Sequence, residues 1–127
     1  DYDLIKPEYK YGDSRIDFYM EKDGRKYLME VKGCTLEIDG IGYFPDAPSE
    51  RAVRHLHELM HAVKQGYHCI LAFVIAMPGV TVVRPNMTTH PAFGQALSEA
   101  HKAGVDVWYL TCEITADSIK AAELYKA

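Results

Sequence analysis

The chain has 127 residues, of which 48% are hydrophobic and 25% are charged, so it is the size of one globular domain and is not disordered by default. Its 14 basic and 18 acidic residues give a net charge of −4, which argues against a free-standing, non-specific nucleic-acid binder. The longest apolar run, Cys69 to Met77, is too short to cross a bilayer, so we expect no membrane association.

The beginning of the chain and its cysteines indicate its context. There is no initiator Met and no signal peptide, so we expect a fragment or a processed product. Cys34, Cys69 and Cys112 are odd in number and widely spaced, which fits neither a disulfide framework nor a metal site. These features favour a cytoplasmic protein.

Two hairpins are predicted first. Residues 14–19 and 27–32 alternate polar and apolar side chains, and Asp23-Gly24 between them is a two-residue turn signal. A second turn at Asp39-Gly40 predicts that the strand continues through 35–38 and folds back through 41–44.

A long helix is predicted next, with Asp46 or Ser49 as its N-cap, Pro48 near its start and Gly66 at its end. Its apolar stripe is expected to be Val53, Leu56, Met60 and Val63.

The rest of the chain alternates strands and helices. Residues 67–76 are predicted to form a central strand covered on both faces, and a short run at 81–83 follows the break at Pro78-Gly79. A helix over 91–102 and a strand over 105–110 predict a crossover that makes this strand parallel to the central one. Residues 116–126 are weakly helical. The order indicates an α/β fold around a mixed sheet.

The first hairpin predicts a pair of carboxylates. If Lys22 pairs with Arg25 across the turn, Asp17 faces Glu30 and Arg15 faces Lys32. Opposed residues have Cβ atoms roughly 4.5–5.5 Å apart, and two carboxylates at that distance repel each other. Mg²⁺ or Mn²⁺ would remove the conflict, and Lys32 beside it could assist a water or stabilise a phosphate. An ordinary cross-strand ion network explains the same residues and stays open.

These stretches resemble the sugar fermentation stimulation protein A family. The resemblance covers nearly the whole chain and is carried by residues 10–18 (Lys-Tyr-Gly-Asp-Ser-Arg-Ile-Asp-Phe), 30–32 (Glu-Val-Lys), 44–51 (Phe-Pro-Asp-Ala-Pro-Ser-Glu-Arg) and His55-Leu56. It implies a restriction-endonuclease-like mixed sheet flanked by helices, in the C-terminal nuclease-like domain that we expect residues 1–127 to form. We expect residues 1–127 not to include the smaller N-terminal β-barrel domain of the family.

The resemblance also implies site residues and partners. Asp17 matches the first acidic position of the PD-(D/E)xK nuclease motif, although Ile16 stands where the motif has Pro, and Glu30 and Lys32 match its Glu-x-Lys. Glu8 is a possible additional acid. Family members are described as nucleic-acid-binding and sometimes as regulators of sugar metabolism. We therefore expect metal-dependent phosphodiester hydrolysis with DNA as the partner, or else a non-catalytic module that binds nucleic acid or regulates sugar metabolism.

The predicted helix carries a second group of polar residues. Arg51 and His55 are four residues apart and share a helix face, which is expected to lie away from the apolar stripe. With the resemblance, we interpret Arg51 and His55, together with Asp46 and Arg15, as substrate-binding residues; a solvated helix face is the alternative.

The same helix contains His57-Glu58-Leu59-Met60-His61, a literal zinc metalloprotease signature. A protease of this type needs a third ligand, and Lys64 stands where the extended motif has Gly. We keep the zinc protease as a third hypothesis.

Overall fold

The computed structural model describes residues 2–114 and 119–127. The elements in chain order are β1 (Leu4–Tyr11), β2 (Ser14–Lys22), β3 (Arg25–Cys34), β4 (Leu36–Ile38), β5 (Ile41–Phe44), α1 (Glu50–Lys64), β6 (His68–Ile75), β7 (Val83–Pro85), α2 (Pro91–Ala103), β8 (Asp106–Ile114) and β9 (Ile119–Lys126).

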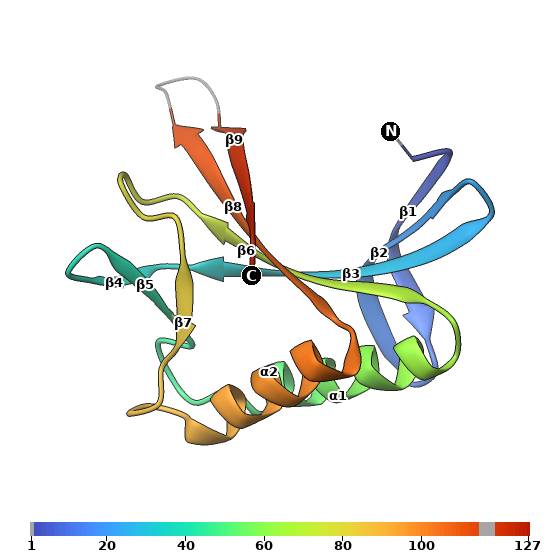
Figure 1. Ribbon diagram of the computed structural model, residues 1–127, viewed down its shortest axis with the longest axis horizontal. Helices are drawn as coiled ribbons and strands as arrows, with labels where there is room; N and C mark the ends of the chain where they lie inside the picture. The colour runs from blue at the N-terminus through green and yellow to red at the C-terminus, as the bar shows by residue number, and fades with distance from the viewer. Residues whose placement is uncertain (1, 115–118) are drawn as a thin grey trace.

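A six-stranded mixed sheet organises the fold (Figure 1). Its strand order is β1-β2-β3-β6-β8-β9, with β3, β6 and β8 parallel to one another and antiparallel pairs at both edges. Helix α1 follows β4 and β5 on the connection from β3 to β6. Helix α2 lies on the connection from β6 to β8, and these two strands are parallel, so the predicted crossover is confirmed. The second hairpin is also confirmed, but β4 does not extend the main sheet: it joins β5 and β7 in a separate three-stranded sheet.

The first hairpin forms around the predicted turn. Asp23 and Gly24 have φ values of 52° and 77°, the left-handed conformation that a two-residue hairpin turn requires. The strands pair from Lys22 with Arg25 as far as Phe18 with Met29, which is the predicted register.

Both helices pack on one face of the main sheet, as Figure 1 shows. The core on this face joins Leu28, Leu71 and Phe73 of the sheet to Leu56 of α1 and Phe93 of α2. On the opposite face, a second cluster contains only residues of the N-terminal segment and the strands: buried Met20, Ile70 and Ala72 with Tyr2, Phe18, Tyr27, Met29 and Trp108 against them. The expected cover on both faces of β6 is therefore provided by helices on one side and by neighbouring strand side chains on the other.

The helix termini follow from their residues. Of the two predicted caps, Ser49 is the one used: its Oγ accepts a hydrogen bond from the Ala52 amide at 3.2 Å. Gly104 ends α2 in the left-handed conformation, with φ of 109°. In the described ranges, neither helix has the length and apolarity to span a membrane.

The two edge strands differ from the sequence prediction. The weak helix predicted over 116–126 is wrong where the structure describes it, because Ile119–Lys126 is the edge strand β9, paired antiparallel with β8; residues 116–118 lie outside the described residues. Pairing with β8 outweighs the helix propensity of its alanines. Strand β1 was not predicted, since Pro7 interrupts its pattern, although an edge strand tolerates proline.

Candidate functional site

The β2–β3 hairpin changes character at Asp17. Past Phe18 and Met29, the predicted backbone pairs Asp17–Glu30 and Arg15–Lys32 do not form. Instead, the Asp17 amide donates to Glu30 Oε1 at 2.9 Å, and the Val31 amide donates to Asp17 Oδ2 at 2.7 Å. The two carboxyl groups therefore accept the hydrogen bonds that backbone carbonyls would accept in a regular strand pair. These reciprocal bonds hold the two groups together on the face toward α1.

Glu30 is a buried acid. Its side chain lies on the helix-covered face and the residue is only 1% exposed. Burial, and then the charge of Asp17, raise the pKa of Glu30 to about 7, against the opposing effects of the Asp17 amide, Lys32 and Arg51. Near neutral pH, this group exchanges a proton easily or accepts a cation in its place.

Lys32 and His55 complete the group. Glu30 Oε2 lies 3.0 Å from His55 Nδ1 and 3.7 Å from Lys32 Nζ, and the last two atoms are 2.9 Å apart. Burial, followed by the charges of Lys32 and Arg51, lowers the pKa of His55 to about 4, so its imidazole is neutral near pH 7. Burial also lowers the pKa of Lys32, although Glu30 and Asp17 oppose the shift.

The position of His55 corrects the expectation of a helix face away from the core. His55 is 4% exposed and faces the sheet, together with Ala52, Leu56 and Leu59. The small Ala52 and Ala62 belong to this contact face, while Val53 is only partly buried, so the face is rotated from the predicted stripe.

The other predicted residues lie at the margin or outside the group. Arg51 is exposed one turn before His55, and its charge acts on the pKa values of Glu30, Lys32 and His55. Arg15 and Asp46 are also exposed, and no hydrogen bond or ion pair within the described part of the chain links them to this group.

Glu8 lies on β1, directly across from Asp17 of β2. The β1–β2 pairing runs through Pro7–Phe18 and Tyr9–Ile16 and leaves Glu8 and Asp17 unpaired between them. Glu8 has φ of 51°, a strained conformation for a residue other than glycine. Asp17 is therefore released from regular pairing with both neighbouring strands. Within residues 2–114 and 119–127, however, no three acidic, His or Cys side chains converge into one metal-ligand group.

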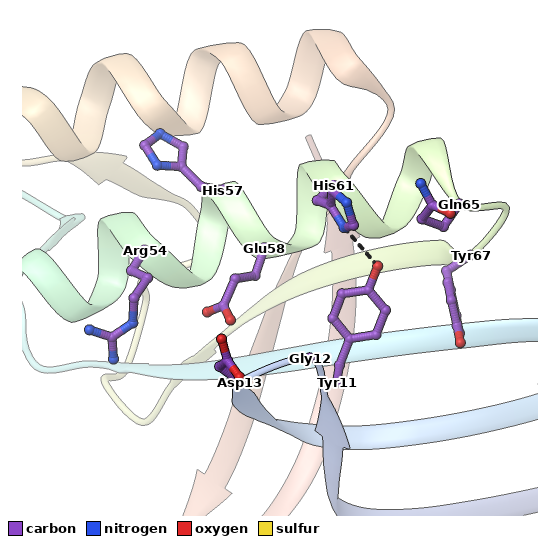
Figure 2. A pocket seen from close by; sticks show the side chains of 9 residues that line it. All are labelled: Tyr11, Gly12, Asp13, Arg54, His57, Glu58, His61, Gln65 and Tyr67. Carbon is purple, nitrogen blue, oxygen red and sulfur yellow. Dashed lines mark hydrogen bonds between the residues drawn. The ribbon is translucent and has the colours of Figure 1, made fainter.

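The predicted zinc motif lies further along α1 (Figure 2). His61 Nδ1 is hydrogen-bonded to the Tyr11 hydroxyl at 2.9 Å, and in the figure His57 points away toward α2. Within residues 2–114 and 119–127, no third acidic, His or Cys side chain joins this pair in a metal-ligand group, whereas a zinc site needs at least three protein ligands. Tyr11 was missed by the sequence reasoning because β1 was not predicted.

The chain is similar to known proteins over most of its length. Residues 1–118 match the family model described as the sugar fermentation stimulation protein RE domain. A sugar fermentation stimulation protein homolog of Desulfitobacterium hafniense strain Y51 is 50% identical over 94% of this chain and 52% of the relative. A homolog from Shewanella loihica is 42% identical over 99% of this chain and 54% of the relative.

A solved structure supports the same relationship. The structure of Pyrococcus furiosus SfsA in complex with Ca²⁺ matches with a TM-score of 0.86 and 28% identity, over 94% of this chain and 52% of that one. The restriction-endonuclease-like fold is thereby confirmed. The chain spans about half the length of the curated relatives it matches.

Proposed function

The chain belongs to the sugar fermentation stimulation protein family, and from that premise we propose that its domain hydrolyses phosphodiester bonds of nucleic acid, most directly DNA, with a divalent cation. The observation that carries this proposal is the reciprocal bonding of Asp17 and Glu30, which keeps two carboxyl groups together where the ladder would otherwise continue. A strand pair with a purely structural role would keep its backbone hydrogen bonds and would not need carboxylate side chains as acceptors.

The donor chemistry of these residues fits Mg²⁺ or Mn²⁺. Both cations prefer hard oxygen ligands, and Asp17 and Glu30 supply carboxylate oxygens. Asp17 Oδ1 makes no hydrogen bond to any residue that the structure describes, and the charge of Asp17 raises the pKa of Glu30. A cation relieves this repulsion. The similar Pyrococcus furiosus SfsA is known in complex with Ca²⁺, so a divalent cation is compatible with a member of this family.

Asp17 and Glu30 would hold the cation, and the chain's own side chains account for the other requirements of hydrolysis. A bound divalent cation supplies Lewis-acid stabilisation of the phosphate and a more acidic water. Lys32, whose pKa is lowered by burial, can accept a proton from the attacking water or donate to a phosphate oxygen. His55 is a positioning residue, because its Nδ1 lies within hydrogen-bond distance of both Lys32 and Glu30 and, depending on the tautomer, accepts from Lys32 or donates to Glu30.

Arg51 is assigned to the phosphate. It is exposed at the start of α1, close enough for its charge to affect three groups of the site. Its planar guanidinium can donate two parallel hydrogen bonds to phosphate oxygens. Asp46 and Arg15, both exposed, remain candidates for contacts with the rest of the nucleic-acid strand.

The test is a cleavage assay. Purified chain is incubated with double-stranded DNA, single-stranded DNA and RNA in Mg²⁺, Mn²⁺ or EDTA. We expect cleavage of DNA with Mn²⁺ or Mg²⁺, none in EDTA, and a loss of about a hundredfold or more in Asp17→Asn and Glu30→Gln. Asp23→Asn, the same change at the hairpin turn, is the matched control and should cleave like wild type.

Two outcomes would overturn the proposal. Binding of DNA without cleavage under any cation would favour the non-catalytic regulatory module. Cleavage that survives in both Asp17→Asn and Glu30→Gln would place the chemistry elsewhere.

A further inference from the structure

A pocket of about 700 Å³ lies beside the candidate site, between α1 and the β1–β2 turn (Figure 2). It is lined by Tyr11, Gly12, Asp13, Arg54, His57, Glu58, His61, Gln65 and Tyr67. None of these residues belongs to the Asp17–Glu30 group. The lining does include His57, Glu58 and His61, the polar residues of the zinc-protease signature, which the proposed function does not use. Its size suits a small planar ligand.

Glu58 gives the pocket an unmet hydrogen-bond acceptor. Its Oε1 atom is buried, and no donor in the described ranges reaches it. Figure 2 shows the carboxylate pointing into the pocket toward Asp13. A buried carboxylate oxygen without a donor is costly, so this atom is suited to a ligand that carries an N–H group.

Two tyrosines form the opposite end of the pocket. The Tyr11 hydroxyl is fixed by its hydrogen bond to His61, and the Tyr11 and Tyr67 rings meet edge to face with centroids 5.5 Å apart. Aromatic side chains held in this way offer a rigid surface for a flat ring.

The lining charges narrow the ligand class. Asp13 and Glu58 together disfavour an isolated anion, and the described residues provide no set of three ligands for a metal. A neutral, planar group with N–H donors satisfies Glu58 and packs on the tyrosines. Arg54, also in the lining, can bind a phosphate attached to that group.

We propose that this pocket receives one nucleobase of the nucleic-acid strand, with an exocyclic amino group donating to Glu58. The inference rests on the proposed function for its substrate class and deepens it. The pocket adjoins the candidate site along α1: Arg54 and Glu58 flank His55 in sequence, and their charges act on its pKa. A base next to the cleaved phosphate would therefore be read here.

The acceptor at Glu58 predicts a preference among bases. Cytosine, adenine and guanine carry an exocyclic amino group, and carboxylates accept from such groups. Thymine presents carbonyl oxygens in their place, which a carboxylate repels. The pocket should therefore discriminate against thymine.

The test follows nucleotide binding by NMR, independently of cleavage. The ring signal of His61, which is hydrogen-bonded to Tyr11 in the pocket lining, reports on the pocket, and those of His68 and His101 serve as references. With dCMP we expect a saturable shift of His61 but not of the references, with at least about tenfold weaker binding of dTMP. Deoxyribose 5-phosphate should produce no such shifts.

Variants sharpen the result. Glu58→Gln should weaken dCMP binding about tenfold, because a charge-assisted acceptor is lost, whereas Glu99→Gln on α2 should bind like wild type. Equal shifts with deoxyribose phosphate, no saturable shift with any nucleotide, or an unchanged affinity in Glu58→Gln would each overturn the inference.

Asp17→Asn separates this inference from the proposed function. Nucleotide shifts in wild type and Asp17→Asn, without DNA cleavage by either, would refute hydrolysis and leave the base pocket standing. Metal-dependent cleavage by wild type with no nucleotide shifts would refute the pocket alone.

Discussion

The two halves of the β2–β3 hairpin follow different rules. From the Asp23-Gly24 turn to Phe18 and Met29, backbone pairs hold the strands together and side chains alternate between the two faces. From Asp17 onward, carboxylate side chains accept the hydrogen bonds that a ladder would use, and an acid becomes buried. One half is built for stability, and the other places charged groups at a stability cost.

The difference is the basis of the proposed cation site. Glu30 is almost fully buried beside Asp17, and both burial and the Asp17 charge raise its pKa. Like charges held together inside a fold are unfavourable unless another interaction compensates for them. The irregular half is therefore where we propose a cation, whereas the regular half needs only its core.

The largest effect should come from the regular half. Leu28 is fully buried between the sheet and the helices, so Leu28→Ala removes core contacts and leaves a cavity. We expect a loss of about 2–5 kcal/mol in the free energy of unfolding, with no change in the response to Mn²⁺ per folded molecule. Urea denaturation measures the loss. A loss well below this range would mean that the core is more adaptable than the packing indicates.

A substitution in the irregular half should raise the free energy of unfolding, opposite to the effect of Leu28→Ala. Glu30→Gln keeps the shape, removes one charge, and should stabilise the metal-free chain by about 1–3 kcal/mol near neutral pH. The same urea experiment in EDTA detects this gain. If Glu30 instead serves a structural ion pair with Lys32, the variant will be less stable than wild type, and the comparison between the two halves fails.

The pH dependence follows from the raised pKa of Glu30. Between the ordinary value of 4.5 and the folded value of about 7, the folded chain keeps a proton that the unfolded chain loses, so this group's contribution to stability falls as pH rises. His55 acts in the opposite direction: its folded pKa of about 4 lies below the ordinary 6.5, so its contribution grows over that window.

The difference in unfolding free energy between Glu30→Gln and wild type isolates the Glu30 term. This difference should be small below pH 4.5, and the variant should become increasingly more stable than wild type as pH rises toward 7. Denaturation series in EDTA across this range measure it. A difference that stays constant with pH would contradict the assigned burial of the acid.

The smallest effect is expected at the turn. Gly24 has φ of 77°, where a Cβ is strained, although nothing lies within 4 Å of an added Cβ. Gly24→Ala should therefore cost about 1 kcal/mol and leave cleavage unchanged. Thermal melts and the cleavage assay check both parts; a loss of cleavage would show that the two halves are coupled.

The elements near strong local signals were predictable from sequence. The Asp-Gly turns, the apolar run of β6 and the Gly104 helix end each have a local physical cause, and all three are found. The proximity of Asp17 and Glu30 also followed from the hairpin register, but not the side-chain bonds that replace the ladder. Those bonds depend on where the strands separate, which no local pattern encodes.

The placement of His55 could not be predicted from apolar periodicity. That pattern counts large apolar residues, whereas α1 contacts its surroundings through Ala52, Ala62 and the buried His55 as well as leucines. A polar residue enters such a face only because Glu30 and Lys32 are there to meet it. Partners from distant strands are tertiary information, as is the pairing that makes β9 a strand.

Whether the irregular half of the hairpin holds a cation can be measured by calorimetric titration of Mn²⁺ into the metal-free chain at a pH above the pKa of Glu30, comparing wild type, Asp17→Asn and Asp23→Asn. We expect saturable binding in wild type and in Asp23→Asn, where the change lies in the regular half, and loss of that binding in Asp17→Asn. Equal Mn²⁺ binding in all three proteins, or none in wild type, would contradict the claim that the irregular half of the hairpin exists to hold a cation.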